Sequence, residues 1–342
     1  MSFGSPLNSA FATTQHHPTS QLLHRNLDAV HSDAWYLGFP RGAGPVSDFQ
    51  LATSFDQGAL DYLGQGTNEF APPEALVSQV ILYFPKAKSE AQMLIHFALS
   101  GLTPDGRLWL VGDNKGGIKS APNLIKKLGG KAQKIDGARH CSLLEVADLS
   151  PLAQSLGKFQ LADYWQQNHH VQDLTLCSLP GVFSHGKLDV GTQVLLDHLP
   201  KLTGKVLDFG CGCGVIGSRI LQQNPKVQVS FSDVSRLATL ATEQTLRTNG
   251  LPFEQVFTSD GLSQVSGRYN HIVTNPPFHE GVKTQYETTE TLFRNAKRFL
   301  KPGGSLILVA NRFLQYEPLL AKQFRQVTEL VVEKGFKVLQ AV

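Results

Sequence analysis

Residues 206–214 read VLDFGCGCG, an apolar run that leads into three glycines at alternating positions. The apolar run is typical of a buried strand, and residues 214–223 have the periodicity of a helix. Gly210, Gly212 and Gly214 allow the backbone to turn tightly and a ligand to come close, because no Cβ atom stands in the way. A strand, a glycine loop and a helix in this order predict a ligand site at the carboxyl edge of an α/β sheet.

The residues around this loop alternate between strand and helix patterns. Alternation of this kind predicts a mostly parallel, doubly wound α/β sheet. Two further alternating runs around Lys334-Gly335 are typical of a hairpin that joins the sheet edge antiparallel. The expected strands cover 204–209, 226–233, 253–260, 270–275 and 304–311, the expected helices cover 214–223, 236–250 and 287–300, and the hairpin covers 327–342.

The first half of the chain repeats part of this plan. The stretch LTPDGRLWLV (102–111) shares Leu, Pro, Gly and Val residues with LKPGGSLILV (300–309), always 198 residues apart. A strand pattern over 78–84 and a helix pattern over 88–100 precede the first stretch. Self-similarity on this scale predicts a duplicated domain. We expect two tandem Rossmann-like domains, 1–160 and 161–342. A linker over 149–171 should hold one helical piece, and the segment over 1–30 should be weakly structured or peripheral.

The composition is that of an ordinary globular protein. The 342 residues are 41% hydrophobic and 17% charged, and a net charge of +3 is too small to indicate nucleic-acid binding by itself. The N-terminus has no signal-peptide pattern, no apolar run has the length of a membrane helix, and the four cysteines have no CxxC spacing. We therefore expect a cytoplasmic protein without a membrane segment or a metal site, and we interpret the His-His pairs at 16–17 and 169–170 as loop residues.

Acidic residues stand at the ends of several expected strands. Asp208 directly precedes the glycine loop, Asp233 is placed to accept hydrogen bonds from two ribose hydroxyls, and Asp260 ends a third strand. A nicotinamide cofactor is a rival ligand. The G-x-G-x-G spacing differs from G-x-G-x-x-G, however, and a carboxylate beside the loop suits an ammonium or sulfonium group better than a pyrophosphate.

The loop and these acids resemble the S-adenosylmethionine site of class I methyltransferases. The two loop cysteines are then small loop residues and not redox centres. The resemblance implies that the cofactor is S-adenosylmethionine and that the residues binding it are Asp208, Gly210, Cys211, Gly212, Gly214, Asp233, Val234, Asp260, Gly261 and Asn275.

The stretch TNPPF (274–278) closes the strand expected before it with a rigid turn, because proline cannot continue a helix or a central strand. It resembles the (N/D)PP(F/Y/W) motif of enzymes that methylate planar exocyclic or amide nitrogens, which implies catalytic roles for Asn275, Pro276, Pro277 and Phe278. Such a nitrogen is a poor nucleophile. Its N–H groups can donate to the Asn275 side-chain oxygen and the Pro276 carbonyl, which hold it in line with the methyl group. Phe278 offers a face on which a flipped-out base can stack.

Several stretches together resemble the ribosomal RNA small-subunit guanine-N2 methyltransferase family (RsmC) over nearly the full length. They include LTLCSLPGVFSHGKLDVGTQVLLDHLP (174–200), VLDFGCGCGVIG (206–217) and TNPPFHEG (274–281). The resemblance implies transfer to the N2 amine of a guanine in 16S ribosomal RNA, in the assembled small subunit, by a chain that we expect to be a monomer. It also implies that only the C-terminal domain is active. The sequence agrees, because YFPK (83–86) stands where the second half has NPPF, and WYLGFPRGAG (35–44) lacks a G-x-G-x-G loop.

The segment GVFSHGKLDVGT (181–192) is expected to lie over the cofactor and the target. Phe183, Asp189, Gly191 and Thr192 are candidate contacts there, and Phe183 is a candidate substrate-binding residue. An alternative reading is a helix N-terminus, with Asp189 or Thr192 near its cap.

Residues 115–139 of the first half are rich in Lys and Arg and hold a single acid. A basic stretch in a domain without catalytic residues suggests contact with RNA phosphates, and Lys126, Lys127 and Lys131 are the candidate substrate-binding residues there. The alternative is an ordinary solvated face.

Three other functions stay open at this stage. A glutamine-N5 protein methyltransferase uses a related NPP(Y) turn, and an adenine-N6 methyltransferase acts on a comparable amine. An RNA-binding or assembly factor without catalysis is the third.

Overall fold

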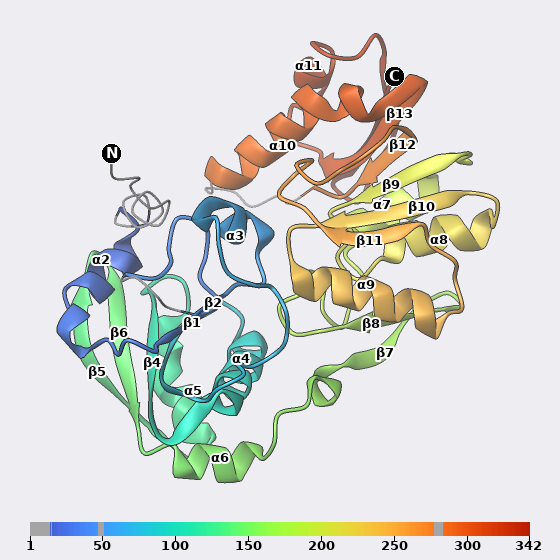
Figure 1. Cartoon of the computed structure of the whole chain (residues 1–342). Coiled ribbons are helices and arrows are strands. Elements are labelled where there is room, and N and C mark those ends of the chain that lie inside the picture. The colour runs from blue at the N-terminus through green and yellow to red at the C-terminus, as the bar shows by residue number, and fades with distance from the viewer. Residues whose placement is uncertain (1–13, 15, 47–50, 277–282) are drawn as a thin grey trace, which may run out of the picture. The chain divides into compact units, whose positions relative to one another are not determined.

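The structure is a computed structural model that describes residues 14, 16–46, 51–276 and 283–342. The chain divides into two compact units, unit 1 (Met1–Tyr164) and unit 2 (Trp165–Val342). Figure 1 shows that each unit is built around its own sheet. No helix in the described ranges is long and apolar enough to cross a membrane.

Unit 2 contains a seven-stranded sheet in the order β11-β10-β9-β12-β13-β15-β14. The first five strands run parallel, and β15 and β14 form the predicted antiparallel hairpin at the edge (Figure 1). A separate antiparallel pair, β7 with β8, precedes this sheet in sequence. The strands are β7 (Gln166–Val171), β8 (Leu174–Ser178), β9 (Lys205–Phe209), β10 (Gln228–Asp233), β11 (Gln255–Thr258), β12 (Tyr269–Thr274), β13 (Leu300–Asn311), β14 (Val327–Glu333) and β15 (Phe336–Ala341).

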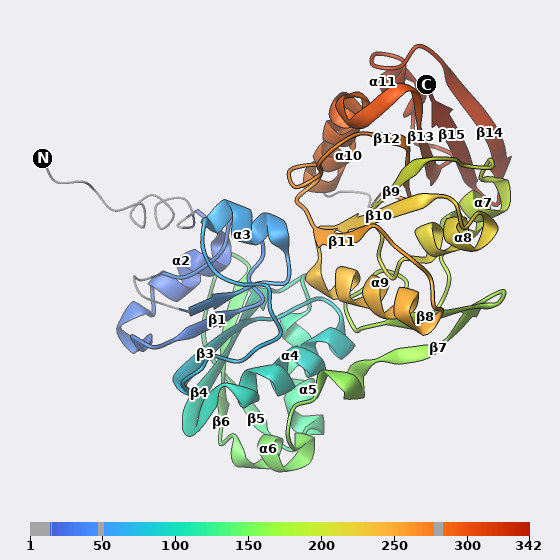
Figure 2. The ribbon, with the colours of Figure 1, turned by 45° about the vertical axis from the view of Figure 1, so that its right-hand side comes forward.

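Helices cover both faces of the unit 2 sheet. Figure 2 shows α7 (Val190–His198), α8 (Val215–Gln223) and α9 (Arg236–Thr248) on one face, and α10 (Lys283–Asn295) and α11 (Glu317–Leu320) on the other. The 3₁₀ turn η4 (Ala296–Phe299) follows α10. Apolar residues of the central strands pack against residues of α10 and α11 and form the core of that face. The strand residues include Leu207, Ile272, Leu306 and Leu308, and the helix residues include Phe293 and Leu320.

One glycine lets α8 approach the sheet closely enough to hold the glycine loop in place. A Cβ atom at Gly217 would lie 2.2 Å from the ring of Phe231 and 3.0 Å from the side chain of Val229, both on β10. Glycine is a poor helix former, so its place inside α8 is explained by this close contact and not by helix propensity.

Unit 1 contains a six-stranded sheet in the order β2-β1-β3-β4-β6-β5, again parallel except for an antiparallel hairpin at one edge. The predicted doubly wound, mostly parallel architecture is therefore confirmed in both units. The strands are β1 (Trp35–Leu37), β2 (Leu51–Thr53), β3 (Val77–Tyr83), β4 (Leu102–Asp113), β5 (Lys131–Ala138) and β6 (Cys141–Ala147). The helices are α2 (Pro18–His24), α3 (Gln57–Leu63), α4 (Lys88–Ser100), α5 (Ala121–Lys127) and α6 (Ser150–Leu156), with 3₁₀ turns η1 (Leu27–Ala29), η2 (Ile118–Ser120) and η3 (Leu161–Tyr164).

The two sheets repeat the same pairing register. Leu82 of β3 pairs with Leu110 of β4, and Thr274 of β12 pairs with Leu308 of β13, so the two partners on the later strand are again 198 residues apart. Both strand pairs have a register shift near their start, between Val77 and Gln79 in unit 1 and between Tyr269 and His271 in unit 2. Tyr83 in unit 1 therefore occupies the position that Asn275 occupies in unit 2.

Two predictions about the ends of unit 1 were wrong. The segment 1–30 is not uniformly weakly structured, because α2 lies within it and buries Leu22 and Leu23 completely. The helix is only seven residues long, too short for a clear periodicity, although Pro18 at its start is a typical signal. The segment 149–171 holds the expected helix α6, but the last residues of the segment form strand β7, which pairs with β8. The polar sequence QQNHHV of β7 does not have the apolar pattern from which a strand is predicted.

Two boundaries in unit 2 also differ from prediction. Strand β13 begins at Leu300 and not at 304, because its Pro-Gly-Gly residues take part in an extended strand with a register shift. Helix α10 covers Lys283–Asn295 where 287–300 was predicted, and a 3₁₀ turn replaces its expected last residues.

Candidate active site

Unit 2 has a cavity of about 360 Å³ at the carboxyl ends of β9, β10 and β12. This is the edge of the sheet where the sequence predicts a ligand site. The residues lining the cavity are Phe183, Asp189, Phe209, Gly210, Gly212, Ser232, Asp233, Val234, Ser259, Gly261, Asn275, Pro276, Asn311 and Phe336.

The glycine loop adopts a conformation that requires glycine. Gly210, Gly212 and Gly214 have φ angles of +70°, +57° and +79°, a region that residues with a side chain rarely adopt. The amides of Gly210 and Cys211 donate to the Ser232 carbonyl at 2.8 and 3.0 Å, which ties the loop to β10. A Cβ atom at Gly212 would meet nothing within 4 Å, so this face of the loop is open for a ligand. Gly214 has a different role, because a Cβ there would lie 2.9 Å from Thr242.

Asp233 lines the cavity at the end of β10. Its two carboxylate oxygens accept hydrogen bonds from the amides of Gly212 and Ser235, each at 2.9 Å. A carboxylate oxygen has more than one lone pair, so Asp233 can accept ribose hydroxyls in addition to these amides. Val234 and Gly261 line the same cavity, whereas Asp260 does not, although its neighbour Ser259 does.

Asp208 lies beneath the loop and does not line the cavity. Its side chain is fully buried, and one oxygen accepts the Gly217 amide of α8 at 2.8 Å. Its other oxygen, Oδ1, has no hydrogen-bond partner among the described residues. Burial raises the pKa of the Asp208 carboxyl from its ordinary 3.8 to about 7; the Gly217 hydrogen bond lowers this pKa and the charge of Asp233 raises it. Asp208 therefore supports the start of α8 and the loop above it.

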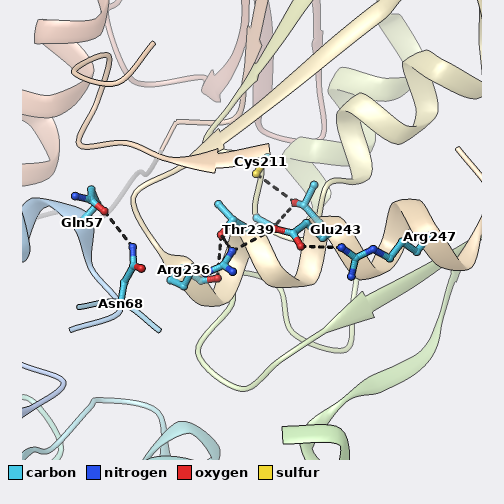
Figure 3. A network of polar contacts seen from close by, with 9 residues as sticks. Gln57, Asn68, Cys211, Arg236, Thr239, Glu243 and Arg247 are labelled. Carbon is cyan, nitrogen blue, oxygen red and sulfur yellow. Dashed lines mark hydrogen bonds and ion pairs between the residues drawn. The ribbon is translucent and has the colours of Figure 1, made fainter. Parts of the chain in front are cut away.

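The two loop cysteines face the protein interior. The Thr242 hydroxyl of α9 donates to Cys211 Sγ at 3.2 Å, and Figure 3 shows Cys211 turned toward that helix, beside the ion pairs that Arg236 and Arg247 make with Glu243. Burial raises the pKa of Cys211 well above its usual range and raises the pKa of Cys213 to about 12. Both thiols therefore stay protonated, as small loop residues. The described residues hold no group of three or more His, Cys, Asp or Glu side chains able to bind a metal ion.

Asn275 follows β12 and is oriented by the start of α7. Its Nδ2 donates to Asp189 Oδ2 at 3.0 Å and to Thr192 Oγ1 at 2.8 Å. Pro276 also lines the cavity. Pro277 and Phe278, which we also expect in the catalytic turn, lie outside the described residues.

The segment 181–192 contains the N-terminus of α7 and two residues that line the cavity. Asp189 is the N-cap of α7 and accepts the Thr192 amide at 2.9 Å, and it also lines the cavity. Phe183 lines the cavity with 56% of its surface exposed, so its ring is available to a ligand. Gly191 makes room for another lining residue, because a Cβ there would lie 2.9 Å from the ring of Phe336.

Sequence reasoning missed five of the lining residues. They are Phe209, Ser232, Ser259, Asn311 and Phe336. Four of them lie at or next to the carboxyl ends of parallel strands, which is the signal that could have found them. Phe336 begins the last strand, which runs antiparallel, so its position was not visible in the pattern of strand ends.

The cavity has the groups that S-adenosylmethionine requires. The open face of the loop at Gly212 lets a ligand come close to the backbone, and the Asp233 carboxylate can accept hydrogen bonds from ribose hydroxyls. Ser232 lines the cavity, and its buried hydroxyl has no hydrogen-bond partner among the described residues.

Unit 1 has different residues at the corresponding positions. The register places Tyr36 at the position of Asp208, Ser54 at that of Asp233, and Tyr83 at that of Asn275. Pro40 stands where unit 2 has Gly212, between Gly38 and Gly42, which keep φ angles of +72° and +83°. Both tyrosine rings are buried, and the Tyr83 hydroxyl donates to the Gly44 carbonyl at 3.0 Å.

The raised pKa of Asp208 predicts a pH-dependent stability. The unfolded chain loses this proton near pH 3.8 and the folded chain near pH 7, so the folded state binds more protons between these values. The contribution of Asp208 to stability therefore falls as the pH rises through this window. In thermal unfolding of the cofactor-free protein, Asp208→Asn should melt progressively higher than wild type from pH 5 to pH 8. A difference in melting temperature that does not change with pH would contradict the assignment.

Comparisons with known proteins agree with this geometry. Residues 173–340 match the family model of the methyltransferase small domain, and residues 49–168 match that of the methyltransferase small domain N-terminal. A solved structure of a T. thermophilus 16S rRNA N2 methyltransferase (RsmC) in complex with AdoMet and guanosine has a TM-score of 0.79, with 24% identity. It covers 95% of this chain and 92% of that one, and the likeness establishes the fold.

Curated relatives match the chain over most of its length. Ribosomal RNA small subunit methyltransferase C of Shewanella pealeana is 41% identical over 93% of this chain and 97% of its own length. The protein of the same name from Pseudomonas syringae pv. syringae is 39% identical, over 95% of this chain and 98% of its own. At this identity and coverage, the chain belongs to the family of ribosomal RNA small subunit methyltransferase C.

Proposed function

We infer that this chain transfers a methyl group from S-adenosylmethionine to the exocyclic N2 amine of a guanine in 16S ribosomal RNA. The observation that carries the inference is the orientation of Asn275 at the cavity. Both hydrogens of its Nδ2 are used on the α7 side, so its Oδ1 is the atom that remains for a substrate. An amide oxygen beside a methyl-donor cavity is the acceptor that an aromatic amine requires.

The residues of the site account for binding and orientation. The open loop at Gly212 and the carboxylate of Asp233 hold the cofactor, which when bound supplies an electrophilic methyl group on a sulfonium. Asn275 Oδ1 and the Pro276 carbonyl accept the two N–H groups of the amine and direct its lone pair toward that methyl group. Because these acceptors are fixed before the reaction, they stabilise the positive charge that develops on the nitrogen. No strong general base is needed, since the proton can leave after the bond has formed.

We propose that the substrate is the assembled small ribosomal subunit and that the enzyme acts in the cytoplasm as a monomer without a metal ion. The exposed Phe183 supports base binding, because a ring at the cavity mouth can stack on a flipped-out base, as we expect of Phe278. Adenine-N6 and glutamine-N5 transfer use a related turn and are separated from guanine-N2 transfer by the product.

Product identification tests this function. Purified protein with labelled S-adenosylmethionine is offered small subunits, naked ribosomal RNA, DNA or release factors, and the modified residue is identified after digestion. We expect label in the N2 amine of guanine. The control Asn275→Ala should bind the cofactor normally and transfer methyl groups about a hundredfold more slowly, the scale of one lost preorganised contact. Label in adenine or glutamine, or none at all, would overturn the assignment.

We propose that unit 1, residues 1–160 in our sequence-based division, no longer binds the cofactor and serves as a platform for RNA. The replacement of Asp208, Gly212, Asp233 and Asn275 by other residue types at the matching positions supports the loss. The platform rests on exposed lysines: Lys126 and Lys127 in the last turn of α5 and Lys131 at the start of β5. Strand β5 is also the edge of its sheet, where lysines guard against strand pairing with other chains, so the test must separate the two roles.

Charge reversal at Lys126, Lys127 and Lys131 tests the platform. Each phosphate contact adds to the salt dependence of RNA binding, so three Lys→Glu changes should weaken binding to small subunits and lower the slope of log K against log salt by about 2. The matched control reverses the exposed Lys201, Lys226 and Lys322 of unit 2, with the same change in net charge. Equal effects of the two variants, or unchanged binding, would show that the platform is elsewhere.

A further inference from the structure

The proposed function imposes a requirement on the Asn275 side chain that the residue alone does not meet. An amide carries an acceptor on one side and a donor on the other, and the two differ only by a rotation of 180°. In one orientation Oδ1 is available to a substrate amine. In the other, an NH₂ group stands there and repels the N–H groups of the substrate. Something must therefore fix the rotation.

The contacts of Asn275 define a single orientation. Both hydrogens of Nδ2 are used, one on Asp189 Oδ2 at 3.0 Å and one on Thr192 Oγ1 at 2.8 Å. An ionised carboxylate can only accept. The Thr192 hydroxyl lies 3.3 Å from the same Asp189 oxygen and donates to it, which leaves the hydroxyl oxygen free to accept from Asn275. A reversed amide would place Oδ1 against a carboxylate oxygen that cannot donate and a hydroxyl whose hydrogen is already donated to Asp189.

Asp189 and Thr192 are themselves held rigidly, although they are 86 and 83 residues from Asn275 in sequence. Asp189 caps α7 by accepting the Thr192 amide at 2.9 Å, and Thr192 is buried. The orientation of Asn275 is thus coupled to the first turn of a helix, which is a more rigid frame than the turn that carries the amide.

We propose that Asp189 and Thr192 are positioning residues for methyl transfer, which fix the amide of Asn275 with its oxygen toward the substrate amine. This assignment rests on the proposed function, because it concerns the same reacting nitrogen. Neither residue acts on the substrate; both act through Asn275.

The substitution Thr192→Val tests the proposal with little change in shape. Valine matches threonine in volume but cannot accept a hydrogen bond, and the backbone amide capped by Asp189 remains. We expect kcat to fall about tenfold, the scale of one orienting hydrogen bond. KM and the affinity for S-adenosylmethionine should stay within about twofold of wild type, as for independent sites. The matched control is Thr239→Val, which replaces a fully buried threonine of α9 that makes hydrogen bonds with Arg236, and it should leave kcat unchanged.

A double-mutant cycle separates positioning from a general effect on folding. In the Asn275→Ala background the amide is absent, so Thr192→Val should change kcat by less than about twofold. A second variant, Asp189→Gly, places a residue that is tolerated at an N-cap and removes the acceptor of Asn275. It should lower kcat when Asn275 is present and change kcat by less than about twofold when Asn275 is alanine. It supplies the test if Thr192→Val fails to bind the cofactor.

The outcomes are distinct. Wild type that methylates no guanine refutes the proposed function. Wild type that is active, with Thr192→Val and Asp189→Gly at the wild-type kcat, refutes the positioning role. Variants that lower kcat as much without Asn275 as with it refute it too.

Discussion

The left-handed conformation of the loop from Gly210 to Gly214 is the constraint on which the site depends. Three positive φ angles within five residues are possible because each position is glycine. They let the loop fold back onto the Ser232 carbonyl of β10 and present the Gly212 amide to Asp233. The loop also starts α8, which Gly217 allows to pack closely on Phe231. The shape of the cavity, the position of the Asp233 carboxylate that lines it and the start of α8 behind it therefore all depend on the conformation of this loop.

The two units show what side chains add to a common backbone. Gly38 donates to the Thr53 carbonyl at 2.8 Å, as Gly210 does to Ser232, and the outer glycines of both loops keep positive φ angles. Pro40 cannot adopt the positive φ of Gly212, because its ring fixes φ near −65°. Counted back from the paired strands, His17 and Ser20 stand at the positions of Asp189 and Thr192, on α2 where unit 2 has α7. Unit 1 thus keeps the scaffold and replaces the polar groups that surround the loop, Asn275 included.

Local sequence patterns predicted the fold well. They predicted the site less completely, because several of its contacts join segments that are far apart in the sequence. Alternation and the glycine loop were sufficient for the doubly wound sheets, the hairpin and the cavity edge. The burial of Asp208 away from the cavity depends on how closely α8 packs, which Gly217 decides and no spacing rule reveals. The contact of Asn275 with Asp189 joins segments far apart in the chain, so the sequence could nominate both residues without pairing them. The short helix α2 and the polar strand β7 were not predicted, because the segments that they pack against or pair with define them and their own periodicity does not.

One backbone plan occurs twice in the chain, and we infer that a cofactor site survives only in unit 2. Isothermal titration calorimetry of the full chain with S-adenosylmethionine measures this directly, as the number of molecules bound. We expect one molecule per chain, and we expect binding to be lost when Gly212 is replaced by proline, the residue found at the matching position in unit 1. Two molecules bound per chain, or one that persists undiminished in Gly212→Pro, would contradict it.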